Sequence, residues 1–187
     1  FGDAICFVLM DAFLGYHQVK LSPASAIKTA FFAPHRRKYI YLVKPFGVRN
    51  TPTLFLAMMY DLKELWTDMC AHYGIVPSED KGTTIIVDDT FLFAVSKENA
   101  FIIVRCVCLI ARKYNLTWKL KKCRWFPSKV EFVAVDIHKH GNAPASSKIQ
   151  MIPNWNLPFS PSNIMSFNRS SIFYSRSLKF SHIKITP

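Results

Sequence analysis

The chain has 187 residues, half of them hydrophobic, which suits one folded domain, or one domain and part of a second, and excludes a disordered chain. Lysine and arginine total 24 against 12 aspartates and glutamates, giving a net charge of +12 at pH 7. This excess favours a polyanionic partner, with nucleic acid as the default, although charge of this kind also serves solubility.

The cysteines and the apolar runs limit the class of protein further. Five cysteines without a Cys-x-x-Cys pair suggest neither a disulfide framework nor a zinc site, so we expect free thiols, a reducing compartment and no secretion. His138 and His140 fit surface residues better than metal ligands. The longest apolar run, residues 101–110, is interrupted by Arg105 and is too short to span a bilayer, so we expect no membrane association. The chain starts on Phe1 without methionine, and we interpret it as a fragment.

The first third of the chain predicts strands. Residues 4–10 form a continuous apolar run, typical of a strand buried on both faces, that ends on Asp11. A carboxylate there is well placed for function, or it simply ends the strand. We expect two more strands at Lys28–Phe32 and Tyr39–Val43. The basic turn between them, residues 34–38, suits phosphate contact or a solvated loop equally well.

Two helices are predicted in the middle of the chain. Thr51 can cap the first, and Pro52 fits its first turn. An apolar stripe at helical spacing predicts its core-facing side: Leu54, Met58, Leu62, Leu65 and Met69. Ser96 is the expected cap of a second helix over residues 97–114, packed against a sheet.

An acidic pair lies between the two helices. Asp88 and Asp89 separate two short runs rich in β-branched and aromatic residues, so we expect them in the turn of a hairpin. On these residues alone, an exposed acidic turn is the simpler explanation. With a third carboxylate from elsewhere, the same hairpin could hold a divalent cation.

The last third begins with a basic cluster, residues 119–124. Strands are expected at Val130–Val135 and Asp136–Lys139, with a turn at Gly141 and Asn142. A helix is expected over Asn163–Phe180, on a poor pattern.

This order of elements predicts an α+β fold of the split βαβ, ferredoxin-like kind, with helices on one face of the sheet. Such a sheet can bring Asp11 to the tip that carries Asp88 and Asp89. Three carboxylates on a rigid sheet are what a two-metal phosphoryl-transfer site needs.

Seven motifs along the chain occur in the order of one known family. They are Leu9-Met10-Asp11 with Gly15-Tyr16-His17-Gln18, Lys28-Thr29-Ala30-Phe31, the block Pro45–Pro52, Asp88-Asp89, Lys121-Lys122-Cys123, Val130-Glu131-Phe132, and the segment Trp155–Arg176. In series, they resemble the reverse transcriptase domain of gypsy-type long-terminal-repeat retrotransposons, from about Cys6 to Leu178. The resemblance implies a polymerase palm with partial fingers in residues 1–140, and the connection and start of the thumb in residues 141–187.

The resemblance also implies roles for particular residues. Asp11, Asp88 and Asp89 would be the catalytic triad and would bind two Mg²⁺ or Mn²⁺ ions. Tyr16 would lie under the incoming sugar and reject a ribose. The remaining assignments concern substrate and proton transfer: Phe46 and Gly47 would contact the incoming nucleotide and template, and either Lys121 or Lys122 would protonate pyrophosphate.

The implied partners are an RNA or DNA template-primer, dNTP, and the rest of a retroelement polyprotein with RNase H and integrase. The implied location is the cytoplasm, a virus-like particle or the nucleus.

The chain also departs from the family pattern: Ile86 replaces the tyrosine of Tyr-x-Asp-Asp, Leu56 replaces a glutamine, and Val133-Ala134 replaces Leu-Gly. The fingers block expected before Phe1 is missing from the sequence. A catalytically inactive remnant that only binds nucleic acid is therefore the alternative function.

Overall fold

The computed structural model describes residues 3–78, 81–150 and 160–174. The chain divides into two compact units, Phe1–Ser128 and Lys129–Pro187. Of the helices in these described ranges, none combines the length and the apolar character needed to cross a lipid bilayer.

A four-stranded antiparallel sheet organises the first unit. Its order is β4-β5-β1-β6, and its strands are β1 (Cys6–Asp11), β4 (Gly82–Ile86), β5 (Asp89–Ala94) and β6 (Arg124–Trp125). The predicted apolar strand is therefore confirmed as β1, a central strand. Its β-branched and aromatic neighbours in β5 pair with it along its whole length, from Cys6 opposite Ala94 to Asp11 opposite Asp89.

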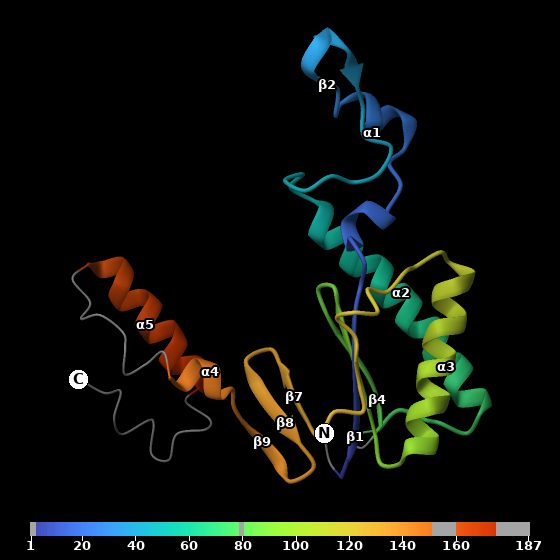
Figure 1. The fold of residues 1–187 in the computed structure, drawn as a ribbon, viewed down its shortest axis with the longest axis vertical. Coiled ribbons are helices and arrows are strands. Elements are labelled where there is room, and N and C mark those ends of the chain that lie inside the picture. The colour runs from blue at the N-terminus through green and yellow to red at the C-terminus, as the bar shows by residue number, and fades with distance from the viewer. Residues whose placement is uncertain (1–2, 79–80, 151–159, 175–187) are drawn as a thin grey trace. The chain divides into compact units, whose positions relative to one another are not determined.

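Two helices pack on one face of this sheet, α2 (Thr51–His72) and α3 (Lys97–Lys113) (Figure 1). Alternate β1 residues, among them Val8 and Met10, point into the core that the helices cover. The odd-numbered residues of β1 face the other way, where Phe7 and Phe91 stack with ring centroids 5.9 Å apart. The predicted α+β sheet with helices on one face is thus confirmed.

The N-terminus of α3 forms as the sequence predicts. Ser96 is the N-cap, and its hydroxyl accepts a hydrogen bond from the Asn99 backbone N–H at 3.2 Å. Arg112 and Lys113 lie in the last turn, where cations interact favourably with the helix dipole. The helix buries one apolar face against α2 and the sheet.

Two details of α2 differ from the prediction. Thr51 is the first helical residue and not the cap, because the N-cap is Asn50, whose side chain makes no capping bond. The predicted stripe is partly right: Leu62 is buried and Met58 and Met69 pack against the core, whereas Leu54 is 48% exposed and Leu65 37% exposed. The residues that α2 buries are Thr51, Phe55, Met59, Leu62, Trp66 and Cys70. This second stripe has equally good helical spacing and carries the larger aromatic side chains, which gain most from burial.

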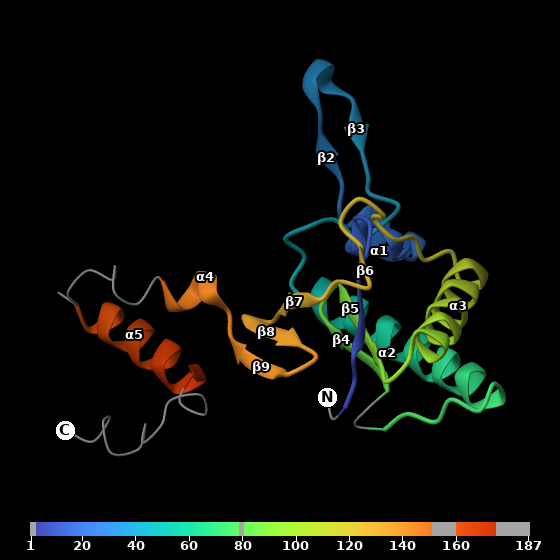
Figure 2. The same ribbon diagram turned by 60° about the horizontal axis from the view of Figure 1, so that its bottom comes forward.

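The segment between β1 and α2 contains shorter strands than predicted. Residues 28–32 form a strand only at Phe31–Phe32 (β2), because Ser22 caps a short helix, α1 (Pro23–Ile27), immediately before them. The second predicted strand is reduced to Lys38–Tyr39 (β3). The basic residues between them do form the turn, as a 3₁₀ segment, η2, at Pro34–Arg36, and Figure 2 shows β2 and β3 as a two-stranded ribbon.

The second unit contains three strands and two helices within its described residues: β7 (Lys129–Phe132), β8 (Val135–His138), β9 (Gly141–Pro144), α4 (Ser146–Ile149) and α5 (Pro161–Tyr174). The predicted strand Val130–Val135 is wrong, because the chain turns at Val133 and Ala134, which both have positive φ (52° and 59°). Neither residue type favours such a turn, so no local pattern predicts it. The C-terminal helix is confirmed as α5, and residues 175–180 of that prediction lie outside the described residues.

Candidate active site

Two of the three predicted carboxylates lie directly opposite each other on neighbouring strands. Asp11 ends β1, Asp89 begins β5, and the two residues are partners in the antiparallel register. Opposed residues of such a pair share a face, with Cβ atoms about 4.5–5.5 Å apart. Both side chains therefore lie on the sheet face that α2 and α3 leave uncovered.

The third carboxylate belongs to the tight turn that joins β4 to β5. This turn consists of Val87 and Asp88, since Ile86 and Asp89 form the last pair of the hairpin. The carbonyl oxygen of Asp88 accepts a hydrogen bond from the Ala12 backbone N–H at 3.1 Å, which fixes the turn against the end of β1. Asp88 is thus in the turn as predicted, whereas Asp89 already belongs to the strand.

A lysine from the basic cluster reaches this group. The Lys122 ammonium lies 3.0 Å from Oδ2 of Asp11. The segment that carries it is tied to β1 because the Lys119 backbone N–H donates to the Asp11 carbonyl oxygen at 2.8 Å, and the Lys122 N–H donates to the Lys119 carbonyl oxygen at 2.8 Å. The sequence leaves Lys121 and Lys122 as equal candidates; the lysine that contacts Asp11 is Lys122.

A glutamine side chain fixes the start of that segment. Gln18 ends the 3₁₀ turn η1 (Gly15–Gln18). Its amide oxygen accepts from the Thr117 N–H at 2.7 Å, and its amide nitrogen donates to the Thr117 carbonyl oxygen at 3.0 Å. Gln18 therefore ties the turn after β1 to Thr117, which lies just before the basic cluster of residues 119–124.

The same 3₁₀ turn presents an aromatic group. The Tyr16 ring contacts Phe46 (centroids 5.3 Å apart) and meets Phe55 edge-on at 5.6 Å. The His17 ring packs edge-on against Phe46 at 5.1 Å, and its Nδ1 lies 3.0 Å from the Lys44 carbonyl oxygen. Phe55 is fully buried and Phe46 is 65% exposed, so the group extends from the core to the surface.

A pocket of about 230 Å³ lies beside these groups. Its lining brings together predicted residues from four parts of the sequence: Asp11, Tyr16, Phe46, Asp88 and Lys122. It does not include Asp89, Gly47 or Lys121. Gly47 adopts a φ of 88°, which other residues rarely adopt, so its backbone shape is the reason for glycine there.

The carboxylates influence one another electrostatically. Burial raises the pKa of Asp89, and the neighbouring charges of Asp88 and Asp11 raise it further, while the Lys122 ammonium opposes them. The hydrogen bond and charge of Asp11 in turn raise the pKa of Lys122, so this lysine stays protonated at neutral pH. The site therefore holds negative charge that a cation would stabilise.

The donor set suits a hard divalent cation, because all three predicted ligands offer carboxylate oxygens. Within residues 3–78, 81–150 and 160–174, however, no group of three or more His, Cys, Asp or Glu side chains is arranged closely enough to hold a metal ion. The cation that contacts Asp11 here is the Lys122 ammonium. The carboxylates therefore fit the metal by their chemistry and by the strands that carry them, and their side chains would have to converge to bind it.

Sequence reasoning missed two contributors to this site. In the sequence, Gln18 stands out only as the last residue of the Gly-Tyr-His-Gln motif, and its paired hydrogen bonds to Thr117 connect residues 99 positions apart, which no local pattern reveals. Lys119 lines the pocket but had no assigned role within the basic cluster. The signal for Lys119 was present, since it opens that cluster.

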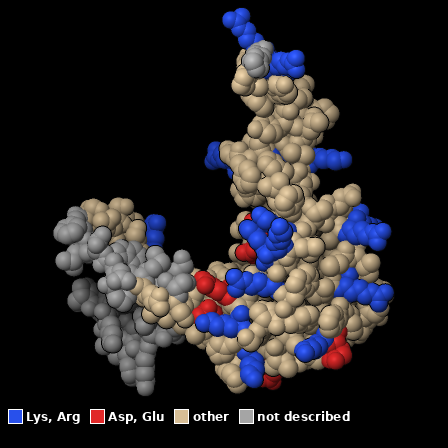
Figure 3. Space-filling view, viewed as in Figure 1, with Lys and Arg blue, Asp and Glu red and all other residues tan. Residues whose placement is uncertain are grey.

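Basic side chains lie at the pocket, where Lys119 and Lys122 line it, and elsewhere on the first unit. On the face shown in Figure 3, Lys and Arg side chains cover more of the first unit than Asp and Glu do. This agrees with the total of 24 basic against 12 acidic residues. A basic surface beside a carboxylate group suits a substrate with several phosphates.

Curated relatives come from retroelements and related viruses. The chain is 26% identical over 175 residues to the retrovirus-related Pol polyprotein from transposon opus of Drosophila melanogaster, covering 94% of this chain and 16% of the relative. It is 25% identical over 174 residues to that from transposon gypsy, also of Drosophila melanogaster, with 92% and 16% covered. The chain thus spans about a sixth of the length of these relatives.

Solved structures share the fold. The foamy viral protease-reverse transcriptase in complex with double-stranded DNA matches with a TM-score of 0.75 and 20% identity, over 91% of this chain and 27% of that chain. The complex with an RNA/DNA hybrid matches with a TM-score of 0.70 and 22% identity, over 91% and 21%. The family model for "Reverse transcriptase (RNA-dependent DNA polymerase)" matches residues 2–137. On this match, which covers more than half of its length, the chain belongs to the reverse transcriptase family.

Proposed function

We propose that this chain is the catalytic part of an RNA-directed DNA polymerase, which transfers a nucleotide from a dNTP to the 3′-hydroxyl of a primer on an RNA or DNA template. One observation carries the proposal: Asp11 and Asp89 are register partners on adjacent strands, next to a turn that holds Asp88. An incidental acidic turn would not need a carboxylate at the end of a separate buried strand.

The three carboxylates are the proposed ligands of two Mg²⁺ or Mn²⁺ ions. Bound there, the ions would supply the positive charge that favours deprotonation of the primer hydroxyl and stabilises the leaving pyrophosphate. The contribution of the chain is a rigid frame: β1 and β5 fix Asp11 and Asp89, and the hydrogen bond from Ala12 fixes the Asp88 turn.

Lys122 is the proposed proton donor to pyrophosphate. It lines the pocket and is charged, and its contact with Asp11 holds the ammonium at the carboxylate group. Tyr16 is the proposed sugar-selecting residue, because Phe46 and Phe55 hold its ring at the wall of the same pocket. A fixed ring can reject an extra hydroxyl by overlap, whereas a mobile one could move aside.

The relatives are polyproteins, so we propose that the chain acts within a longer retroelement protein that also carries RNase H and integrase. Within the chain, we assign residues 1–140 to the palm with partial fingers, and residues 141–187 to the connection and start of the thumb. A polymerase of this kind needs dNTP and a template-primer as its substrates. The basic surface of the first unit supports the second of these.

Primer extension on an RNA template tests the proposal. We expect extension that requires Mg²⁺ or Mn²⁺ and that Asp88→Asn reduces to the level of a blank, while Asp61→Asn, an exposed aspartate on α2, leaves it unchanged. Lys122→Met should slow extension more than Lys121→Met. Equal extension after neutralising Asp11, Asp88 and Asp89 together would show that the carboxylate site is not the catalytic one.

A second function is favoured by the departures from the family pattern, with Ile86 in place of the tyrosine of Tyr-x-Asp-Asp and Val133-Ala134 in place of Leu-Gly. In this alternative, the chain is an inactive remnant that only binds nucleic acid through its basic surface. It predicts binding whose affinity falls steeply with salt, and no extension with any divalent cation. Fluorescence anisotropy with a labelled template-primer at several salt concentrations, run beside the extension assay, separates the two functions.

A further inference from the structure

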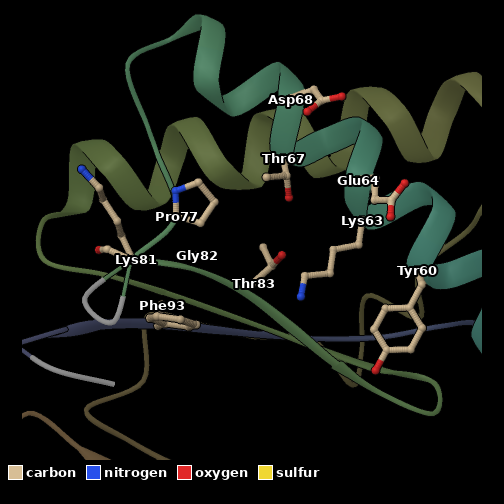
Figure 4. Close-up of a pocket in the computed structure, with 11 residues that line it drawn as sticks. Tyr60, Lys63, Glu64, Thr67, Asp68, Pro77, Lys81, Gly82, Thr83 and Phe93 are labelled. Atoms are coloured by element: carbon tan, nitrogen blue, oxygen red, sulfur yellow. The ribbon is translucent and has the colours of Figure 1, made fainter.

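A second cavity, of about 550 Å³, lies between α2 and the start of β4, away from the carboxylates (Figure 4). None of Asp11, Asp88 or Asp89 lines it. Its volume falls in the range of sites that bind small molecules. The cavity belongs to neither the proposed catalytic pocket nor the lysine segment, and nothing in the proposed reaction uses it.

The floor of the cavity is aromatic because a glycine stands at the edge of the sheet. Phe93 lies opposite Gly82 in the β4–β5 register, and its ring lines the cavity. A Cβ built at Gly82 would come within 3.5 Å of Cζ of Phe93 and 3.8 Å of Cβ of Pro77, so the missing side chain leaves this space open. A flat apolar group can rest there against Phe93 and Pro77.

One hydroxyl on the wall of the cavity already serves as a hydrogen-bond acceptor. The oxygen of Thr83 accepts a hydrogen bond from the indole N–H of Trp66 at 3.0 Å, and Trp66 is fully buried. Because that oxygen serves as the acceptor for Trp66, the hydroxyl hydrogen of Thr83 remains to be donated elsewhere.

Two further donors converge on the same space. Figure 4 shows the Lys63 ammonium extending from α2 towards Thr83, and the Thr67 hydroxyl directed into the cavity from the next turn of the same helix. Lys63 is half-buried, and within the described residues no ion pair is formed by it. The carboxylates of Glu64 and Asp68 also border the cavity, but they point away from Thr83.

We propose that this cavity binds a small organic anion, a carboxylate or phosphate carried on an aromatic body. The anionic group would accept hydrogen bonds from Lys63, Thr67 and Thr83, and the aromatic body would lie against Phe93. A half-buried ammonium beside two hydroxyl donors, with the carboxylates of the lining turned away from them, is a set of groups that an anion satisfies.

Amide chemical-shift titration of the folded chain at physiological salt tests the proposal, with benzoate and phenyl phosphate as anionic probes and benzyl alcohol as the neutral one. We expect saturable shifts at Thr67, Thr83 and Phe93 with at least one anionic probe, and the tighter of the two identifies the anionic group. Lys63→Met should weaken this binding about tenfold or more. Thr67→Val, which keeps the shape of the side chain, should weaken it less.

Two controls separate this site from general attraction to a basic protein and from the catalytic proposal. Lys139→Met removes an exposed lysine that does not line the cavity, and Asp11→Asn alters the carboxylate site; neither should change the affinity. The proposal is overturned by any of three results: shifts that map to the carboxylate pocket, equal affinity for benzyl alcohol, or unchanged affinity in a folded Lys63→Met variant. All of these outcomes are independent of whether the chain catalyses DNA synthesis.

Discussion

Adding a single methyl group at Gly15 should destabilise the chain through one defined clash. A Cβ at this position would lie 2.7 Å from Cζ of Phe55, and 3.1 and 3.2 Å from its two ε carbons. Gly15 is buried, and it begins the 3₁₀ turn that carries Tyr16. The ring of Phe55 would have to retreat until the contact reaches the 3.4 Å at which ordinary packing begins.

That retreat is costly because the ring has no free space around it. Phe55 is 0% exposed, belongs to the main core cluster, and contacts the Tyr16 ring edge-on at 5.6 Å. Overpacking of a closed core costs about 1–3 kcal/mol. Gly15→Ala would otherwise gain a few tenths of a kcal/mol from the less flexible unfolded chain, so a net loss of about 1–2 kcal/mol is expected.

Urea denaturation of four proteins measures the effect: the parent chain, Gly15→Ala, Phe55→Leu and the double variant. If the clash is the cause, Gly15→Ala costs about 1–2 kcal/mol in the parent and under about 0.5 kcal/mol in the Phe55→Leu background, a coupling of roughly 1 kcal/mol. Additive effects of the two substitutions, or a Gly15→Ala variant as stable as the parent, would refute this reasoning.

Three further outcomes are expected. Ser96→Ala should cost about 1 kcal/mol of unfolding free energy through loss of the α3 cap, and Ser96→Asp should retain it; equal losses in both variants would point away from capping. Val87→Gly should stabilise the chain by about 0.5–1 kcal/mol, because Val87 has a φ of 58° and is 43% exposed; a lower urea midpoint would contradict this. Lys129, 2.6 Å from Asp136, lowers the pKa of that carboxyl despite its burial. The stability that this ion pair adds is complete above the unfolded-state pKa of about 3.9 and is lost as the pH falls through the lower folded-state pKa. The unfolding free energy of Asp136→Asn should therefore vary less with pH below about 4 than that of the parent. If the unfolding free energies of the two proteins change in parallel with pH, the pair contributes nothing to stability.

Local sequence signals predict an element correctly where its first residue stabilises it through a local hydrogen bond. The α3 helix begins at Ser96 as predicted, because a serine hydroxyl stabilises a helix start wherever the helix packs. The α2 face was misassigned because that helix has two apolar stripes, and only the sheet beneath it decides that Phe55 and Trp66 face inward. The turn at Val133 and Ala134 was missed since the residues present disfavour it.

The candidate site was predictable in residue types and not in geometry. Periodicity placed Asp11 at a strand end and Asp88 in a turn, and the resemblance to a family supplied the reason to join them. The register that sets Asp11 opposite Asp89 is a long-range pairing, which local patterns do not encode. The choice of Lys122 over Lys121 follows from the fold of the segment that Gln18 and Asp11 hold, and adjacent lysines cannot be separated by pattern.

The ribbon of β2 and β3 has a consequence for how the chain unfolds locally. Its strands have two residues each, and Phe31, Phe32 and Tyr39 are all exposed. A two-stranded hairpin is marginal in water without packing on another layer. Amide hydrogens of the ribbon should therefore exchange with solvent at a small opening free energy, while those of β1 exchange only with global unfolding. The basic turn between its strands can thus open or rearrange at little cost to the sheet that holds the carboxylates.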